Sequence, residues 1–279
     1  MRGTSARDAL DGAITAIAAA GCETPRLDAE VLLAHVLGVG RERLLIDEPT
    51  VEGSAVRAFQ DVVRRRAVER EPVAYIVGLR GFRHIELMVD RRALVPRPET
   101  ELLVELGAAL APAQRVLDLA TGSGAVALAL KDERPDLHVS GSDVSPAALE
   151  LARANSARLG LEVQWLHADL LEGVGDDFDA ILANPPYVAE SQRTTLAPEI
   201  LRHEPPGALF AGPDGLEVIR ALLRQVSTRP TLTTVALEVG AGQAPLVAEF
   251  FDAAGFTDVA VEPDLAGIER VVHGRRRPA

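Results

Sequence analysis

Apolar residues in the N-terminal part of the chain are spaced as they are in amphipathic helices. The clearest series recurs three and four positions apart, at Ala9, Leu10, Ala13, Ile14 and Ile17. We expect two further helices over residues 29–37 and 51–69, the first opened by Asp28 and ended by Gly38 and Gly40. This spacing predicts a small helical domain, and we find no cluster of catalytic residue types within it.

A bridging segment follows, in which the apolar residues are consecutive. Residues 74–77 and 85–89 are rich in β-formers and are separated by Gly78 and Gly81, so we predict two strands joined as a hairpin. The stretch 94–101, Leu-Val-Pro-Arg-Pro-Glu-Thr-Glu, then predicts a stiff extended linker that leads into a helix, because its prolines restrict the backbone.

Strand and helix patterns alternate over the remainder of the chain. Strands are predicted at residues 116–119, 138–142, 163–166, 178–183, 233–239, 258–261 and 270–273. Helices are predicted at residues 125–131, 146–158, 216–225 and 244–254. This alternation is typical of a mostly parallel sheet with helices on both faces, in which ligands bind at the carboxyl ends of the strands.

The tetrapeptide Asn184-Pro185-Pro186-Tyr187 follows one of these predicted strands directly. Each proline fixes φ and removes a backbone donor, so the corner presents an amide side chain and bare carbonyls in one direction. Such an array of acceptors suits the two N–H groups of a planar amino or amide nitrogen. The alternative is a structural turn, because Asn-Pro commonly opens turns.

A glycine-containing loop follows the first strand of the alternating region, as Asp118-Leu-Ala120-Thr121-Gly122-Ser123-Gly124. Its two glycines allow a ligand to approach the backbone. With Ala127 and Asp143 they form a weak dinucleotide fingerprint, which would indicate a nicotinamide oxidoreductase. Asp118 argues against that class, because a carboxylate beside the loop repels a pyrophosphate. The same carboxylate suits S-adenosylmethionine, which carries an ammonium group and no phosphate.

Two further aspartates stand at predicted strand ends. Asp143 can accept hydrogen bonds from both ribose hydroxyls, and its structural alternative is a helix cap, for which Ser145 is better placed. Asp169 can accept a hydrogen bond from an adenine amino group while Leu170 packs on the ring, or it is a loop residue without a role. Together with Asp118, these positions predict a nucleoside-binding site along one sheet edge.

Composition excludes several classes of protein. The net charge of -12 argues against a generic nucleic-acid coat, and the single cysteine, Cys22, excludes an internal disulfide and fits a reducing cytoplasm. We find no apolar run approaching the roughly 18 residues of a membrane span, and no metal-ligand spacing. We therefore expect a cytoplasmic protein without a metal or a membrane partner.

These motifs together resemble those of class I S-adenosylmethionine-dependent methyltransferases. Further segments narrow the resemblance to the HemK/PrmC family of protein-(glutamine-N5) methyltransferases, which act on peptide chain release factors. These segments begin at Pro25, Pro72, Leu94, His203, Ala208 and Asp264, so the resemblance covers nearly the whole chain.

The resemblance implies a fold, a domain organisation and a set of partners. The fold would be α/β: a seven-stranded, Rossmann-like class I methyltransferase domain over residues 99–279, preceded by a small all-α domain over 1–72 that helps to dock the substrate and a β-hairpin linker over 73–98. The substrate would be the glutamine of the Gly-Gly-Gln motif in class I release factors, and the product S-adenosylhomocysteine. We expect a monomer without a stable nucleic-acid partner.

The site residues carry over position by position. Asp118, Ala120, Thr121, Gly122, Ser123, Gly124, Asp143, Asp169, Leu170 and Asn184 would bind the cofactor. The Asn184 oxygen and the Pro185 carbonyl would each accept one N–H of the substrate amide, with Tyr187 packing on the amide plane and Pro186 completing the substrate site. Ala120 departs from the family, which usually has glycine there: with a negative φ the change is mild, and with a positive φ it costs roughly 1 kcal/mol.

Two alternatives remain for this site. Asn-Pro-Pro-Tyr could grip an exocyclic amino group of adenine or guanine in nucleic acid, with the tyrosine stacked on a flipped base. The acidic chain, with 4% aromatic residues, favours a protein substrate. A non-catalytic binding module is the other alternative, and the intact series of aspartates and Asn184 argue against it.

Overall fold

The chain folds into two compact units in a computed structural model that describes residues 4–47, 49–175 and 177–276. The first, which we call the helical unit, comprises Met1–Leu79 and Ala197–His203. The second, the sheet unit, comprises Arg80–Leu196 and Glu204–Ala279. Among the described residues, no helix is both long and apolar enough to cross a membrane.

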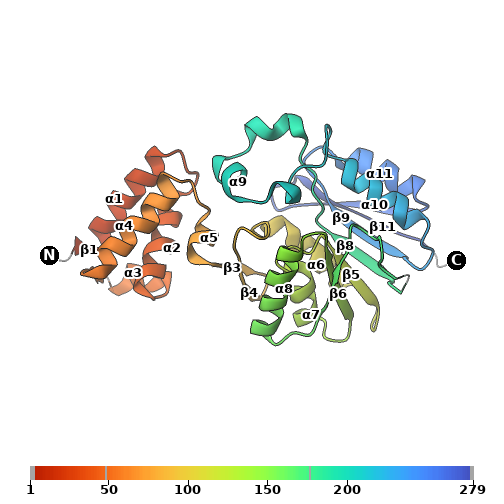
Figure 1. Cartoon of the computed structure of the whole chain (residues 1–279), viewed down its shortest axis with the longest axis horizontal. Coiled ribbons are helices and arrows are strands. Elements are labelled where there is room, and N and C mark those ends of the chain that lie inside the picture. Colours follow the sequence, from red (N-terminus) through yellow and green to blue (C-terminus); the bar gives the residue numbers. More distant parts are fainter. Residues whose placement is uncertain (1–3, 48, 176, 277–279) are drawn as a thin grey trace. The chain divides into compact units, whose positions relative to one another are not determined.

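The helical unit is built from short amphipathic helices around one apolar core (Figure 1). Its elements are β1 Thr4–Ser5, α1 Ala6–Ala19, α2 Pro25–Leu37, α3 Arg41–Asp47, β2 Thr50–Val51, α4 Ser54–Ala67, α5 Val73–Val77 and α9 Pro198–His203. Side chains of α1, α2 and α4 meet in the core, among them Ile17, Leu32, Leu33 and Phe59. The predicted helical periodicity is therefore confirmed, although α3 and the two-residue strands were not predicted.

Helix α2 begins earlier than the sequence indicated. It starts at Pro25 rather than after Asp28, because proline is favoured in the first turn of a helix. Asp28 lies inside the first turn, where its Oδ1 accepts a hydrogen bond from Thr24 Oγ1 at 2.8 Å. Its other oxygen faces the buried Arg66, so this residue is a partner in an ion pair and does not precede the helix.

The predicted strand over residues 74–77 is wrong. This segment forms α5, which follows Pro72 and ends before Gly78. The reason is tertiary, because a helical turn buries Tyr75 and Ile76, and Ile76 joins the core of the helical unit. The hairpin exists one segment later, between β3 Leu79–Phe82 and β4 Ile85–Met88.

The sheet unit contains the predicted parallel sheet, in the strand order β10-β11-β9-β8-β5-β6-β7. Its strands are β5 Arg115–Leu119, β6 His138–Asp143, β7 Gln164–His167, β8 Ala180–Ala183, β9 Thr234–Glu238, β10 Asp258–Pro263 and β11 Glu269–Arg275. Only β11 runs antiparallel to its neighbours β9 and β10. All seven predicted strands are present, which confirms the α/β fold class.

Helices cover both faces of this sheet, as the alternating pattern predicted. The helices of the sheet unit are η1 Pro98–Thr100, α6 Glu101–Ala108, α7 Ala125–Glu133, α8 Pro146–Leu159, η2 Glu190–Thr195, η3 Pro206–Ala208, α10 Glu217–Ser227 and α11 Ala244–Ala253. Figure 1 shows α6, α7 and α8 on one face and α10 and α11 on the other. Successive side chains of β8 point to opposite faces of the sheet. Ile181 therefore packs into the core cluster that includes residues of α10 and α11, whereas Leu182 lies against Gly107 of α6.

The hairpin is fastened to the sheet unit by buried polar contacts. The amide of Asn155, on α8, accepts a hydrogen bond from Met88 N at 2.7 Å and donates to Met88 O at 3.0 Å. The same amide nitrogen donates to Ser123 O, in the glycine loop, also at 3.0 Å. One fully buried side chain thus holds both the hairpin and the loop in position.

Candidate functional site

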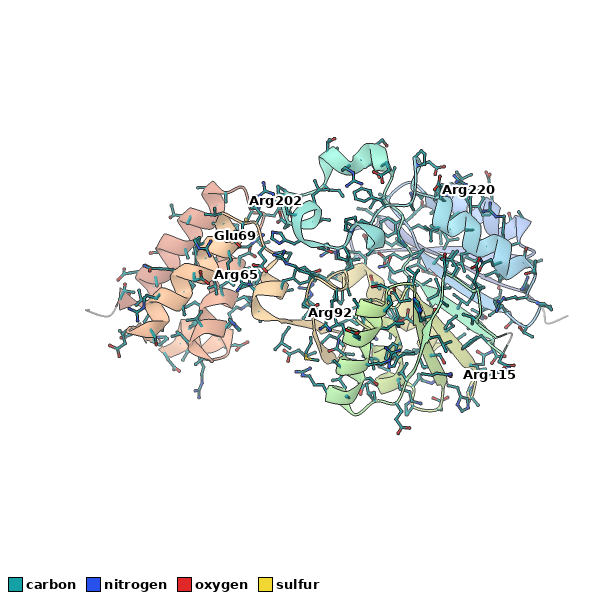
Figure 2. The ribbon with its side chains drawn as sticks, in the orientation of Figure 1. Arg65, Glu69, Arg92, Arg115, Arg202 and Arg220 are labelled. Carbon is teal, nitrogen blue, oxygen red and sulfur yellow. The ribbon has the colours of Figure 1, made fainter. Side chains whose placement is uncertain are left out.

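A cavity of about 350 Å³ opens at the carboxyl ends of β5, β6 and β8, and its walls come from the sheet unit alone. Arg115 marks the opposite, amino end of β5 in Figure 2. Most of the predicted site residues line this cavity: Asp118, Ala120, Thr121, Gly122, Ser123, Asp143, Asp169, Leu170, Asn184 and Pro186. Gly124, Pro185 and Tyr187 do not line it, so the structure brings together ten of the thirteen positions.

Asp118 is almost fully buried at the base of the cavity. Its Oδ2 accepts hydrogen bonds from the Thr121 hydroxyl and, at 3.0 Å, from the backbone N–H of Ala127. No bond to its Oδ1 is found within the described part of the chain. Burial raises the pKa of this carboxyl to about 7, because charge is poorly solvated there. A ligand that brings a positive charge would stabilise the ionised form.

Ala120 adopts the backbone conformation that is unfavourable for a side chain. Its φ is +58°, so the second of the two sequence-based alternatives applies, with a cost of roughly 1 kcal/mol relative to glycine. Gly124 does not line the cavity, and a Cβ built on it would lie 2.9 Å from Trp165 Cη2, on β7. Gly124 therefore allows Trp165 to pack closely against the loop, and its predicted contact with the cofactor stays a prediction.

Asp143 holds the glycine loop as well as facing the cavity. Its Oδ2 accepts a hydrogen bond from Gly122 N at 2.9 Å, and its Oδ1 accepts one from Ser145 N at 2.8 Å. Ser145, not Asp143, caps α8 by accepting from Ala148 N, as predicted. Burial raises the pKa of the Asp143 carboxyl against these two backbone donors. Its predicted contact with ribose hydroxyls stays a prediction.

The far end of the cavity has an apolar wall. Asp169 and Leu170 both line the cavity, and their predicted contact with an adenine ring stays a prediction. The sequence did not point to Val144, which also lines the cavity and leaves 60% of its surface exposed. An apolar side chain exposed directly after Asp143 is suited to packing on a planar ring, and no motif in the sequence marks it.

Asn184 lies at the end of β8, and its amide is held from behind. The Asn184 Nδ2 donates to Thr100 Oγ1 at 3.1 Å, and Thr100 Oγ1 donates to Glu238 Oε2 at 2.6 Å. No hydrogen bond to Asn184 Oδ1 or to the Pro185 carbonyl is found among the described residues. The two acceptors that the sequence predicted for an incoming N–H pair are therefore not used by the protein itself.

Tyr187 is held in the same network and not by the cavity. Its hydroxyl donates to Glu238 Oε1 at 3.1 Å, and its backbone carbonyl accepts from Gln243 Nε2 at 2.9 Å. Burial and the neighbouring Glu238 raise the pKa of the phenol well above its usual range. Tyr187 thus stays protonated, and its predicted packing on a substrate amide stays a prediction.

Two distant segments used for the family resemblance meet at the cavity wall. Arg97, from the Leu-Val-Pro-Arg stretch, donates to Glu204, from the His-Glu-Pro stretch, at 2.5 Å. Glu204 is buried, and Arg97 lines the cavity, as does Arg92 (labelled in Figure 2). No spacing pattern in the sequence relates residues so far apart.

The cavity fits the chemical groups of S-adenosylmethionine. Asp118 Oδ1, which has no hydrogen-bond partner in the described part of the chain, is available for an ammonium group, and the Asp143 carboxylate stands at the adjacent strand end. The Ser142 hydroxyl, which is buried at the wall, has no hydrogen-bond partner among the residues described and could serve a polar ligand. Apolar residues at Val144 and Leu170 complete a wall for a planar base.

The same pattern of motifs occurs in known proteins. Residues 8–78 match the family model for the PrmC N-terminal domain, and residues 98–213 match that for the Methyltransferase small domain. The chain is 40% identical to a release factor glutamine methyltransferase of Deinococcus radiodurans, over 97% of this chain and 98% of that one. It belongs to the release factor glutamine methyltransferase family. The chain is therefore an enzyme that transfers methyl groups.

Other relatives support the same family. Identity is 42% to the release factor glutamine methyltransferase of Cereibacter sphaeroides, over 97% of this chain and 98% of that one. A solved structure of the hMettl16 catalytic domain, in complex with MAT2A 3'UTR hairpin 6, aligns with a TM-score of 0.56 at 15% identity, over 82% of this chain and 85% of that one. At that identity the likeness shows the class I methyltransferase fold alone.

No motif in the sequence identified Thr100 and Glu238, which hold the Asn184 amide through hydrogen bonds. Thr100 was seen only as part of a linker motif, and Glu238 only as part of an apolar strand. A signal was present at Glu238, because a carboxylate inside the run Val-Ala-Leu-Glu-Val, at the carboxyl end of a central strand, is costly unless it has a role. Asp118 stands in the same kind of position on β5.

Proposed function

We propose that the protein transfers a methyl group from S-adenosylmethionine to the side-chain amide nitrogen, N5, of the glutamine in the Gly-Gly-Gln motif of peptide chain release factors. The observation that carries this proposal is that Asn184 lies on the wall of the same cavity as Asp118, Asp143 and Asp169. A methyl donor and an amide acceptor can therefore be held side by side. Membership of the family over nearly the full chain supports the protein substrate.

The cavity would hold the donor by complementary groups. Asp118 would bind the ammonium group, Asp143 the ribose hydroxyls, and Asp169 with Leu170 and Val144 the adenine. When bound, S-adenosylmethionine supplies a methyl group on a cationic sulfur, which makes that carbon electrophilic. The carbon–sulfur bond would break as the carbon–nitrogen bond forms, S-adenosylhomocysteine would leave without this charge, and the methylated nitrogen would release one proton to water.

The residues at the end of β8 would act on the acceptor by positioning it. An amide nitrogen is a poor nucleophile, because its lone pair is delocalised into the carbonyl. Asn184 Oδ1 would accept one N–H of the substrate and the Pro185 carbonyl the other, which orients the nitrogen toward the methyl donor and favours a geometry with an available lone pair. Well-oriented attack can supply several kcal/mol of barrier reduction. Tyr187 would pack against the substrate amide, and Pro186 would stiffen the corner.

The helical unit would help to dock the release factor, in a protein that acts as a cytoplasmic monomer. This role rests on the match of residues 8–78 to the PrmC N-terminal domain and on the lack of a catalytic cluster in that part of the sequence. The acidic net charge of -12 supports a protein partner over a nucleic acid.

The test is transfer of label from S-adenosylmethionine to a purified release factor. We expect incorporation into the release factor and none into a variant whose Gly-Gly-Gln glutamine is replaced by alanine. Label in that variant would refute the target. Label in DNA or RNA under the same conditions, with none in the release factor, would identify a methyltransferase of exocyclic amino groups instead.

A second test addresses the positioning role of Asn184. We expect Asn184→Ala to lower kcat by about 10²-fold, because it removes an acceptor that acts on the reacting nitrogen. Cofactor affinity, measured by calorimetry, should change by no more than a few fold. Near-normal turnover in this variant would overturn the positioning mechanism while leaving the substrate assignment intact.

A further inference from the structure

Glu238 is a buried carboxylate that the proposed reaction does not yet use. It ends β9, is 1% exposed, and forms no ion pair among the described residues. Both of its oxygens accept a hydrogen bond, one from Thr100 and one from Tyr187. Because burial of an unpaired charge is costly, its retention inside an apolar strand calls for a function.

The hydrogen bonds around Thr100 have only one consistent direction when Glu238 is ionised. A carboxylate can only accept, so the single hydroxyl hydrogen of Thr100 must be donated to Glu238 Oε2, 2.6 Å away. The Thr100 oxygen can then only accept from Asn184, which must present its amide nitrogen, at 3.1 Å. The Asn184 oxygen is consequently left for the cavity.

We propose that Glu238 is a positioning residue that acts through Thr100 to fix which end of the Asn184 amide faces the substrate. This inference rests on the proposed function, because it assumes that Asn184 must accept from a substrate N–H. Through Tyr187, the same carboxylate also holds the last residue of the Asn-Pro-Pro-Tyr corner. Glu238 touches neither the cavity nor the reacting atoms, so its effect is indirect.

Protonation of Glu238 would reverse the chain of hydrogen bonds. A neutral carboxyl can donate to Thr100, and the Thr100 hydroxyl hydrogen is then free to be donated to the Asn184 oxygen, which allows the amide to turn its nitrogen toward the substrate. Two donors would then face each other. Burial raises the pKa of Glu238 to about 7, against the lowering effect of its bonds to Thr100 and Tyr187. Glu99 raises it further and Arg270 opposes this.

The first experiment compares three substitutions, two that remove a hydroxyl and one that keeps it, each assayed with saturating S-adenosylmethionine and release factor. Thr100→Val should lower kcat about tenfold, the effect of one lost hydrogen bond, while Thr100→Ser should restore it. Thr228→Val, which removes a hydroxyl that bonds Gln225 O at 2.8 Å outside the cavity wall, should leave kcat unchanged. Cofactor affinity measured by calorimetry should stay within a few fold in all three, which would show that the cavity is folded.

The second experiment uses pH, since a merely structural role would not change a pH profile. In the unmodified enzyme, kcat should fall as the pH drops below about 7. Glu238→Gln cannot titrate, so its kcat should be lower and independent of pH between about 6 and 8. Saturating cofactor keeps the titration of Asp118 out of kcat, because that group acts on cofactor binding. Arg97, Arg270 and Glu99 carry the other charges near the network.

These results separate the inference from the proposed function. An unmodified enzyme that does not label the release factor refutes the proposed function. The positioning role of Glu238 alone is refuted if the unmodified enzyme is active but Thr100→Val leaves kcat unchanged. It is also refuted if kcat of Glu238→Gln still falls as the pH drops below about 7. Loss of cofactor affinity together with kcat in Thr100→Val would also refute it, because the residue would then support the cavity as a whole.

Discussion

Each compact unit contains two carboxylates with little exposed surface, and these two pairs of residues are stabilised differently. In the helical unit, Asp28 lies 2.6 Å from Arg66, and Glu199 lies 3.2 Å from the same guanidinium. In the sheet unit, Asp118 and Glu238 are buried at least as deeply, yet neither forms an ion pair among the described residues. The first pair of carboxylates is neutralised by neighbours, and the second is stabilised only by hydrogen bonds.

This difference appears in the pKa values. The pKa of Glu199 is lowered, because its own backbone N–H and the guanidiniums of Arg70 and Arg66 outweigh the effect of burial. The pKa values of Asp118 and Glu238 are raised to about 7, because burial dominates. Paired buried charges are compatible with a purely structural role, whereas strongly perturbed groups without a charge partner cluster at functional sites. By this criterion Asp118 and Glu238, which both belong to the sheet unit, are the carboxylates expected at a functional site.

The largest expected effect comes from removing the Arg66 guanidinium, which is paired with carboxylates in the helical unit. Arg66→Met should lower the free energy of unfolding by about 3 kcal/mol, because it leaves the buried Asp28 without its cation and leaves Glu199 paired with Arg70 alone. Denaturant unfolding measures this loss. Arg64→Met, two positions earlier on α4 and exposed, is the matched control and should change stability little. Equal losses in the two variants would contradict the structural role of the buried pair.

The next prediction separates cofactor binding from stability at Asp118, one of the two carboxylates without an ion pair among the described residues. Asp118→Asn should weaken S-adenosylmethionine binding about 10²-fold, because a buried partner for the ammonium group is lost, without lowering the melting temperature. Asp28→Asn should do the reverse, with lower stability and unchanged cofactor affinity, since Asp28 does not line the cavity. Calorimetric titration and thermal unfolding of both variants provide the measurements. A large loss of stability in Asp118→Asn would erase the contrast between the units.

A smaller effect is a dependence of stability on pH, which is expected because the pKa values of Asp118 and Glu238 are raised. The folded protein binds a proton on Asp118 and Glu238 near pH 7, whereas the unfolded chain binds it only near pH 4. Their contribution is therefore fully present at low pH and is lost as the pH rises through about 7. Between pH 8 and pH 6, each group should add about 1.4 kcal/mol to the stability of the cofactor-free protein.

The pH effect has an internal control. Unfolding by denaturant at both pH values, repeated on Asp118→Asn and Glu238→Gln, isolates the share of each group. Each variant should lack its own increment. Glu199 does not titrate in this window, because its pKa is lowered. A variant that keeps the full pH dependence would show that its carboxylate is not the titrating group.

The smallest effect compares backbone strain in the two units. Ala120, in the sheet unit, has φ +58°, and Gly38, after α2 in the helical unit, has φ +65° with open space around a built Cβ. Ala120→Gly should stabilise the protein by about 1 kcal/mol, and Gly38→Ala should destabilise it by a similar amount. Melting temperatures test both. Opposite signs confirm strain at Ala120, and a destabilised Ala120→Gly variant would show that its methyl group is needed at the cavity wall.

Much of the catalytic fold was predictable because its signals are local. Each strand of the parallel sheet is a short apolar run, and its polar residue at the carboxyl end is adjacent in sequence, so Asp118, Asp143, Asp169 and Asn184 could be assigned to one edge. The error at residues 74–77 arose because three of the four residues, Tyr75, Ile76 and Val77, are β-formers and carry no local sign that they pack as a helix. Only the burial of Tyr75 and Ile76 in the folded chain decides that this segment forms a helix.

The supporting contacts could not be predicted because they join residues far apart in the chain. Thr100 and Glu238 are 138 positions apart, and Arg66 and Glu199 are 133 apart. No periodicity relates such positions. The return of residues 197–203 to the helical unit was missed for the same reason, since its contacts with Arg66 and Arg70 exist only in the folded chain.

The sequence by itself determined the class of fold, the sheet edge at which a ligand is expected, and the residues that would meet a methyl donor and an amide. Those properties follow from periodicity and from the chemistry of residues at strand ends. Only the tertiary structure decided which way the Asn184 amide points, because that depends on a hydroxyl and a carboxylate brought from distant segments. Hydrogen bonds have direction, and their direction is set by every partner in the chain of contacts.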